Sequence, residues 1–192
     1  MTQEKWEAGK PVKLETERFF VRSITIDDVD EQYLSWWNDA RVQETLNSPP
    51  RGWTLARARQ HVSNFNNTST FHLGLFRKNP AELVGFVALF ANRQNDIAVI
   101  NIVIGNKKYW GSGVPKEAAT VIFPFAFEEL KVNKLKSEVN SSNRSSLKAT
   151  KDLGFIEEGI LRQDVKHFSG KRLDKHVFGM LAEDWRKTIT TR

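Results

Sequence analysis

Apolar residues occur along this chain in short runs separated by polar turns, and the length and composition of each run predict its secondary structure. Runs that are rich in β-branched and aromatic residues and bounded by turn residues predict strands. We place strands at residues 18–26, 71–77, 83–91, 97–104, 135–140, 155–166 and 172–181. The turn at 78–81 joins two of them as a hairpin, and the turn at 168–171 joins the last two.

Helices are expected where apolar residues follow a helical spacing after a capping residue. We place them after Asp27 or Asp28, over 54–65, over 115–130 with a kink at Pro124, and over 143–153. The order is strand, two helices, three antiparallel strands, helix, strand, helix and hairpin. It predicts a mixed α/β domain that lacks the regular alternation of a doubly wound dehydrogenase.

Composition favours a single domain. The chain has 192 residues, of which 40% are hydrophobic, and this is enough to bury one full core. We expect a flexible segment over 1–10, one domain over 11–185 and a tail over 186–192. No apolar run approaches membrane-spanning length, so no membrane association is expected. The chain contains no cysteine, which excludes disulfides, thiolate metal sites and a cysteine nucleophile. A cytoplasmic enzyme without a metal is the simplest interpretation.

The net charge of the chain is +6. The plainer explanation is solubility, and the alternative is a field that attracts phosphates, nucleotides or nucleic acid. The basic residues are scattered along the chain rather than grouped, which makes nucleic acid the weaker option.

The most informative segment is the glycine turn at 105–113, which follows a β-branched strand and leads into the helix at Pro115. Gly111 and Gly113 allow positive φ angles, so that several backbone N–H groups converge on one point. The helix N-terminus adds partial positive charge there. The turn lacks the lysine of a P-loop and the third glycine of the dinucleotide fingerprint. By itself it fits either a tight strand-to-helix turn or a pocket for a pyrophosphate.

A second group of residues follows about 30 positions later along the chain. Glu138 lies in a predicted strand, the run 140–146 is rich in Asn and Ser, and Leu153–Gly154–Phe155 comes next. Asn143 is a good helix cap on its own, and the glycines fit ordinary turns. The two groups together are far more specific than either one alone.

These segments resemble the GNAT superfamily of acetyl-CoA-dependent N-acetyltransferases, and most closely its branch of ribosomal-protein alanine and serine N-acetyltransferases. The resemblance covers nearly the whole chain, and it implies one domain with a twisted, mostly antiparallel sheet flanked by helices. It rests on the opening strand Leu14–Arg22, the loop Tyr109–Gly113 with Lys108 where the family prefers Gln or Arg, Asn143, Ser146, Leu153–Phe155 and the closing Glu183–Trp185.

The resemblance also implies how acetyl-CoA, the cosubstrate, is held. The strand before the turn would pair with the pantetheine arm, and the strand from Leu135 would diverge from it to leave a wedge for the thioester. Asn143 would bond the pantetheine or a nearby water, and Ser146 would lie near the sulfur. The pairing strand residues are Ile102, Val103 and Ile104, and the pyrophosphate would lie on backbone N–H groups of Lys108, Tyr109, Trp110, Gly111, Ser112 and Gly113.

Acetyl transfer needs a neutral amine, so a base or a chain of waters must remove a proton. Relatives often carry a glutamate on the strand before the glycine turn, and residues 97–102 contain no carboxylate. Glu138 is one substitute, Asp164 and His167 are others, and a water relay without a dedicated base stays open.

The leaving thiolate takes up a proton, and many relatives supply it from a tyrosine. This chain has only Tyr33 and Tyr109, and neither belongs to the helix after Asn143. Ser146 is then the best remaining candidate, although a capping or solvent-facing hydroxyl is an equally good interpretation.

The two-helix segment would form the wall of the acceptor pocket. Trp36, Trp37 and Trp53 are its candidate substrate contacts, although packing is the commoner role of such rings. Four basic residues either meet the CoA phosphates or form a solvated face. They are Lys107, Lys116, Arg144 and Lys148.

We therefore expect an acetyl-CoA-dependent N-acetyltransferase that acts on a primary amine by direct attack in a ternary complex. The amine is a protein N-terminal α-amine or a small molecule, with an amino-sugar nucleotide as an alternative. The rivals are a non-catalytic acetyl-CoA sensor on the same fold and, more weakly, a nucleic-acid-binding domain. The oligomeric state is open, with a homodimer among the options.

Overall fold

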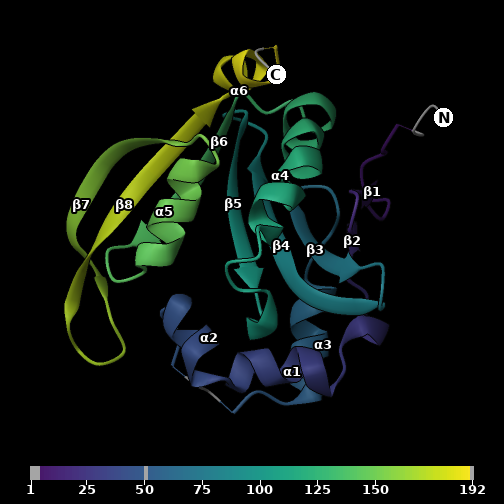
Figure 1. Ribbon diagram of the computed structural model, residues 1–192, viewed down its shortest axis with the longest axis vertical. Helices are drawn as coiled ribbons and strands as arrows, with labels where there is room; N and C mark the ends of the chain where they lie inside the picture. Colours follow the sequence, from purple (N-terminus) through teal and green to yellow (C-terminus); the bar gives the residue numbers. More distant parts are fainter. Residues whose placement is uncertain (1–4, 50–51, 191–192) are drawn as a thin grey trace.

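The computed structural model describes residues 5–49 and 52–190, which form one eight-stranded sheet with helices on both faces (Figure 1). The strands lie in the order β1-β2-β3-β4-β5-β6-β8-β7. Their bounds are β1 Lys13–Glu15, β2 Phe19–Ser23, β3 Thr70–Arg77, β4 Glu82–Asn92, β5 Ile97–Ile104, β6 Lys134–Asn140, β7 Ile156–Lys166 and β8 Arg172–Leu181. All neighbouring strands are antiparallel except β5 and β6, which confirms the predicted mixed, mostly antiparallel sheet.

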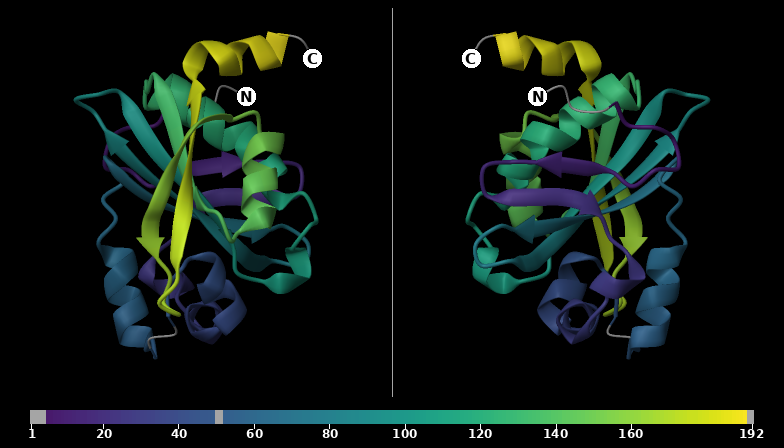
Figure 2. Two further views of the ribbon diagram at one scale, coloured as in Figure 1. Left: turned by 90° about the vertical axis from the view of Figure 1, so that its left-hand side faces the viewer. Right: turned by 90° about the vertical axis from the view of Figure 1, so that its right-hand side faces the viewer.

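The helical segments fall into two groups. Three helices and a 3-10 turn come before β3, and the others follow the strands from β5 onward (Figure 2). Their bounds are η1 Ile26–Asp28, α1 Glu31–Asn38, α2 Ala40–Thr45, α3 Leu55–Ser63, η2 Lys107–Tyr109, α4 Val114–Pro124, the π-helical turn η3 Phe125–Glu129, α5 Arg144–Asp152 and α6 Ala182–Thr190. In the described part of the chain, no helix combines the length and the apolar character that crossing a membrane requires.

Each face of the sheet buries its own apolar cluster, because successive side chains of a strand point to opposite faces. On one face, Leu73 and Ile100 pack with Ile122 of α4 in the main core. On the other face, Phe86 and Val103 pack with side chains of α1 and α3. We call these the α4 face and the α1–α3 face.

The strands β5 and β6 separate soon after they meet. They pair at three positions, Ile97 with Lys134, Ala98 with Leu135 and Val99 with Lys136. Beyond these positions β5 stays paired with β4 as far as Ile104, and β6 stays paired with β8 as far as Asn140. The facing edges of residues 100–104 and 137–140 are therefore left without a strand partner in the described chain.

The start of α1 corrects the sequence prediction. Asp30 caps this helix by accepting a hydrogen bond from the Tyr33 backbone N–H at 2.8 Å, so neither Asp27 nor Asp28 is the cap. Asp28 is held instead by Arg22 through two bonds of 2.6 and 2.8 Å, and it closes the short turn η1.

Three elements lie outside the strands and helices placed from the apolar pattern. These are β1, α2 and α6. The six-residue helix α2 is set by its cap, since Asp39 accepts from the backbone N–H groups of Arg41 and Val42. The expected kink at Pro124 is the point where α4 changes into the π-helical turn η3, because proline removes a helical N–H donor.

Both chain ends have defined structure where they are described. Trp6 packs edge-on against Phe71 and Phe125, with ring centroids 5.6 and 5.4 Å apart. At the other end, α6 continues the chain as a helix through Thr190, past the expected start of the tail at 186.

Gly105 is the point where β5 leaves the sheet under Trp36. A Cβ atom built on Gly105 would lie 2.0 Å from Cδ2 of Trp36, whose side chain is buried. The strand can therefore pass beneath this indole only because residue 105 has no side chain.

We predict that Gly105→Ala lowers the free energy of unfolding by about 1–3 kcal/mol, the usual range for overpacking a well-filled core. Urea denaturation followed by circular dichroism measures this change. Gly159→Ala is the matched control, because its Cβ would meet nothing within 4 Å, and it should stay within about 0.5 kcal/mol of the parent. Equal stability of the two variants would contradict the steric argument.

Candidate functional site

The candidate site begins at the unpaired edge of β5. In a strand, alternate residues direct their N–H and C=O groups to the same neighbour, so residues 100–104 present several of these groups to the space that β6 leaves. An extended ligand can satisfy them as an added strand does. The Ile104 carbonyl is already used, because it accepts from the Trp110 indole Nε1 at 2.8 Å.

The glycine turn lies directly after this edge and opens α4. Gly111 and Gly113 have φ angles of 74° and 78°, and a Cβ at either position would meet nothing within 4 Å. In the described chain, no acceptor is assigned to the backbone N–H groups of Gly111, Gly113 and Val114. Unpaired N–H groups at a helix N-terminus are suited to an anion such as a phosphate.

Glu82 of β4 holds the turn from the sheet side. Its carboxylate accepts from the Asn106 amide at 2.6 Å and from the Tyr109 hydroxyl at 2.7 Å, and Gln32 of α1 donates to it at 3.2 Å. The Tyr109 side chain is therefore an anchor within the protein. Its backbone is also used inside the turn, because its N–H donates to the Asn106 carbonyl at 3.0 Å and its carbonyl accepts from the Ser112 hydroxyl at 2.7 Å.

Glu117 holds the first turn of α4 from the other side. Its carboxylate accepts from the Thr16 hydroxyl at 2.7 Å and from the backbone N–H of Arg18 at 2.8 Å, and it pairs with the Arg18 guanidinium at 2.5 Å. Burial alone would raise the pKa of Glu117, but these hydrogen bonds outweigh it and lower the pKa. Glu117 thus stays ionised and fixes the helix end that carries the free amides.

The four basic residues considered for phosphate contacts divide into two pairs. Lys107 forms an ion pair with Asp39, and Lys148 pairs with Asp152 on α5. Lys116 and Arg144 are exposed, and the described chain gives them no ion pair. Of these four residues, Lys116 and Arg144 are the two whose charge remains available to a bound phosphate.

Asn143 caps α5, as its position in the sequence allowed. Its Oδ1 accepts from the Ser146 backbone N–H at 3.1 Å and from the Ser145 hydroxyl at 3.0 Å. Its Nδ2 donates to the Thr45 carbonyl at the end of α2, at 3.2 Å. The Ser146 side chain is half-buried, and the described chain gives its hydroxyl no partner.

The candidate bases lie on β6, on β7 and in the turn between β7 and β8. Glu138 of β6 is on the α1–α3 face, because Leu135 and Val139 fill the α4 face. Its carboxylate is 3.2 Å from Lys175 Nζ, which also pairs with Asp164 at 2.8 Å, so the lysine joins two of the candidates. These carboxylates, Asp164 first, raise the pKa of Lys175. His167 instead bonds Ser169 within the β7–β8 turn.

A cavity of about 290 Å³ lies on the α1–α3 face beside the unpaired edge of β5. Trp37 lines it and stacks on Trp53, with centroids 4.4 Å apart. Trp36 packs on Gly105 instead, away from the cavity lining. The lining residues are Trp37, Leu46, Ser48, His61, Phe65, His72, Phe86, Ala88, Phe90, Asn101 and Val103.

His72 and Asn101 are site residues that sequence reasoning missed. His72 is 2% exposed and lies 3.0 Å from the Tyr33 hydroxyl. Burial lowers the pKa of His72 to about 3, with a smaller effect from His61, and burial also lowers the pKa of His61. Both imidazoles are therefore neutral at pH 7. The sequence signal that could have found them is a polar residue between apolar residues of a strand, His72 in β3 and Asn101 in β5.

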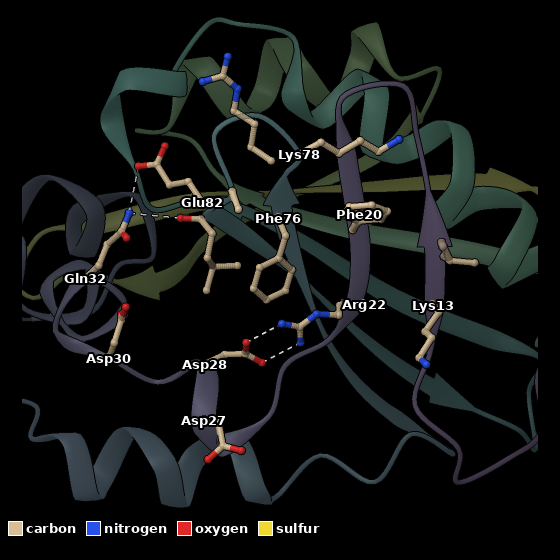
Figure 3. A pocket seen from close by; sticks show the side chains of 14 residues that line it. Lys13, Phe20, Arg22, Asp27, Asp28, Asp30, Gln32, Phe76, Lys78 and Glu82 are labelled. Carbon is tan, nitrogen blue, oxygen red and sulfur yellow. Dashed lines mark hydrogen bonds and ion pairs between the residues drawn. The ribbon is translucent and has the colours of Figure 1, made fainter.

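A larger cavity of about 640 Å³ lies over β1–β3 and the turn η1 (Figure 3). Its wall includes Arg22, which pairs with Asp28 at 2.6 Å and lies 3.8 Å from the centroid of the Phe76 ring. None of its lining residues belongs to β5, β6 or the glycine turn. Its size therefore does not make it the candidate site.

Comparison with known proteins places this geometry in a family context. Residues 18–156 match the family model described as acetyltransferase (GNAT) domain. The chain is 26% identical over 177 residues to the uncharacterized N-acetyltransferase p20 of Bacillus licheniformis, covering 90% of this chain and 97% of that one.

Solved structures share the fold. Spermidine N-acetyltransferase from Vibrio cholerae, in complex with CoA and spermine, matches with a TM-score of 0.78 and 16% identity, over 88% of this chain and 98% of that one. Ribosomal-protein-S5-alanine acetyltransferase from Vibrio fischeri matches with a TM-score of 0.73 and 19% identity, over 91% and 98%.

The buried histidine predicts an acid-sensitive fold. As pH falls below 6.5, the unfolded chain protonates residue 72, whereas the folded chain resists protonation until about pH 3. The unfolded state then binds more protons, so stability decreases between these pH values, by at most about 1.4 kcal/mol per pH unit from this residue.

We predict that His72→Gln, which keeps a hydrogen-bonding group beside Tyr33, flattens this acid dependence. The measurement is the urea midpoint of both proteins at pH 7.5 and pH 4.5. The difference at pH 7.5 gives the cost of the substitution itself. An equal loss of stability in both proteins on acidification would show that residue 72 does not titrate as described.

Proposed function

Because this chain belongs to the GNAT family and is an acetyl-CoA-dependent N-acetyltransferase, we propose that it acetylates a primary amine by direct attack in a ternary complex. The observation that carries the proposal is the separation of β5 from β6 immediately before a glycine turn with free amides. The unpaired edge of β5 offers strand-like pairing for the extended pantetheine arm, and the glycine turn offers N–H groups for the pyrophosphate.

The cosubstrate would lie along this path. Within and directly after residues 108–113, its pyrophosphate would contact the free backbone N–H groups of Gly111, Gly113 and Val114. Its pantetheine arm would pair with the unpaired edge of β5 over 102–104. Free amides, open space above Gly111 and Gly113, and exposed Lys116 and Arg144 support this assignment. The thioester would then reach the wedge between β5 and β6.

The reaction forms one bond and breaks another. The amine nitrogen attacks the thioester carbonyl carbon, the C–S bond breaks, and the CoA sulfur leaves as a thiolate. Backbone N–H groups at the β5 edge stabilise the oxyanion that develops. The amine loses one proton and the thiolate gains one, and the unpartnered hydroxyl of Ser146 supports its role as the donor to sulfur.

Removal of the amine proton is assigned to water. Strand β5 carries Asn101, not a carboxylate, on the side of the cavity. Glu138 and Asp164 share Lys175, so each of these carboxylates already has a cationic partner. Glu138 then helps to hold Lys175 in place beside Asp164.

The acceptor is a protein N-terminal amine or a small-molecule amine. The solved neighbours act on different acceptors, a ribosomal protein and spermidine, by their names, and at this level of identity they share only the fold with this chain. An amino-sugar nucleotide is the alternative that the net positive charge supports. A sensor that binds acetyl-CoA without turnover is the alternative that the missing β5 carboxylate supports.

We predict that Gly111→Glu abolishes CoA binding in isothermal calorimetry, because it places a carboxylate among the amides that would hold the pyrophosphate. Gly111→Ala is the matched control, since it carries the same strain of a positive φ angle without the charge. Circular dichroism verifies that both variants fold. CoA affinity retained in folded Gly111→Glu would refute the assignment of the turn.

We predict that Ser146→Ala lowers kcat by about tenfold or more while the Kd for CoA changes little, as expected for an acid that acts on the leaving group. Thiol release gives kcat, and calorimetry gives Kd. Ser145→Ala is the control on the same helix turn, because its hydroxyl is used in the cap of α5. If Ser146→Ala turns over at the parental rate, then Ser146 has no part in the chemistry.

A further inference from the structure

We propose that the 290 Å³ cavity on the α1–α3 face receives an aromatic ring of the acceptor, so that the preferred substrate is a primary amine one or two carbons from such a ring. This inference rests on the proposed function, and it names the acceptor class. The shared chemistry is an arylalkyl amine, which occurs both as a free small molecule and as the N-terminal residue of a peptide.

The cavity adjoins the place of reaction. Asn101 and Val103 of β5 line it, and both lie beyond Val99, the last residue of β5 that pairs with β6. Strand residues rise about 3.3 Å each, so Asn101 is about 7 Å past the point of separation. A ring held in the cavity would therefore leave its amine beside the wedge where the thioester is proposed to lie.

The walls of the cavity are flat rings. Phe86 stacks nearly parallel to Trp37, with an interplanar angle of 13° and centroids 5.9 Å apart. His72 contacts Phe86 at 4.5 Å and Phe65 at 4.6 Å between centroids. Aromatic pairs at such distances are attractive beyond simple burial, and one more ring in the space would gain the same contacts.

The volume suits one ring and a short chain. Cavities of about 150 Å³ hold a benzene, and small-molecule sites begin near about 300 Å³. At about 290 Å³, this cavity is therefore large enough for a phenyl or indole group.

The cavity offers nothing to a second charge. No Asp, Glu, Lys or Arg is among its lining residues in the described chain, and its two histidines are neutral at pH 7. A polyamine would bring a further ammonium group into apolar surroundings without a partner, at a high desolvation cost. The acidic side chains Asp27, Asp28 and Asp30 line the other cavity, away from the wedge.

Asn101 supplies the polar contact at the mouth. Its side chain is exposed, and the described chain gives it no hydrogen-bond partner. The amide oxygen can accept from an amine N–H and thereby orient the nitrogen without carrying a charge. The site then consists of a ring pocket and one neutral acceptor at its edge.

The test measures binding and turnover separately. Calorimetry with the protein saturated with CoA compares phenethylamine and n-butylamine, and thiol release with acetyl-CoA gives kcat/KM for both amines, spermidine, an amino-sugar phosphate and peptides beginning with Phe or Ser. We expect phenethylamine to bind about tenfold more tightly than n-butylamine or better, with kcat/KM in the same order. The Phe and Ser peptides distinguish an N-terminal residue from a free amine as the source of the ring.

Two variants localise the effect. Ala88→Leu fills the cavity from β4 and should remove most of the preference for the ring while leaving CoA affinity intact. Ala81→Leu fills the larger cavity instead and should leave the preference unchanged. If Ala88→Leu does not fold, then Ala88→Val provides the smaller step.

The outcomes separate this inference from the proposed function. Turnover of spermidine or the amino-sugar phosphate above phenethylamine, unaffected by Ala88→Leu, would overturn the inference and keep the acetyltransferase. Tight ring-dependent binding to the CoA complex without any turnover would support the inference and refute catalysis. Equal binding of phenethylamine and n-butylamine would overturn the inference by itself.

Discussion

The early separation of β5 from β6 is the constraint on which the rest of the site depends. Both strands belong to one sheet, yet each follows a different antiparallel neighbour after three shared positions. Backbone groups that would otherwise be consumed by the ladder are left unpaired in the middle of the sheet. A protein tolerates such groups only where water or a ligand reaches them, since unpaired buried N–H and C=O groups are costly. The catalytic proposal uses this one interruption of the ladder.

The glycine turn is placed against that interruption by two glutamates rather than by its own sequence. Glu82 fixes the turn to β4 and α1, and Glu117 fixes the beginning of α4 to the segment before β2. Neither carboxylate belongs to the turn itself (105–113). These contacts, together with the Trp36 ring over Gly105, hold the turn in place, while the N–H groups of Gly111, Gly113 and Val114 keep no acceptor in the described chain. The glycine turn is thus held at Asn106 and Tyr109 by Glu82, and it has open space beside Gly111 and Gly113.

Much of this arrangement could be predicted from local sequence, and the remainder depends on contacts between distant residues. The β-branched run at 97–104 predicted β5 to its last residue, and Thr54 predicted the cap of α3. The cap of α1 was assigned too early because Asp28 pairs with Arg22 of β2, a side-chain contact that the apolar pattern does not reveal. His72 was missed for the same reason, since a histidine between apolar residues becomes informative only once Tyr33 is known to face it. The role of Asn143 as a cap followed from the sequence, whereas its bond to Thr45 of α2 did not.

The hydrogen bond from the Trp110 indole to the Ile104 carbonyl sets the length of the unpaired edge of β5, called here the ledge. The ledge starts where β6 departs and ends at that indole, so it measures about four residues, or roughly 13 Å. The gap between β5 and β6 narrows to the point where the two strands meet, and the Trp110 indole closes its other end. It therefore has no room for the edge of a second sheet. The unpaired backbone of β5 can therefore remain accessible without pairing to a strand of another molecule, as an exposed edge strand would.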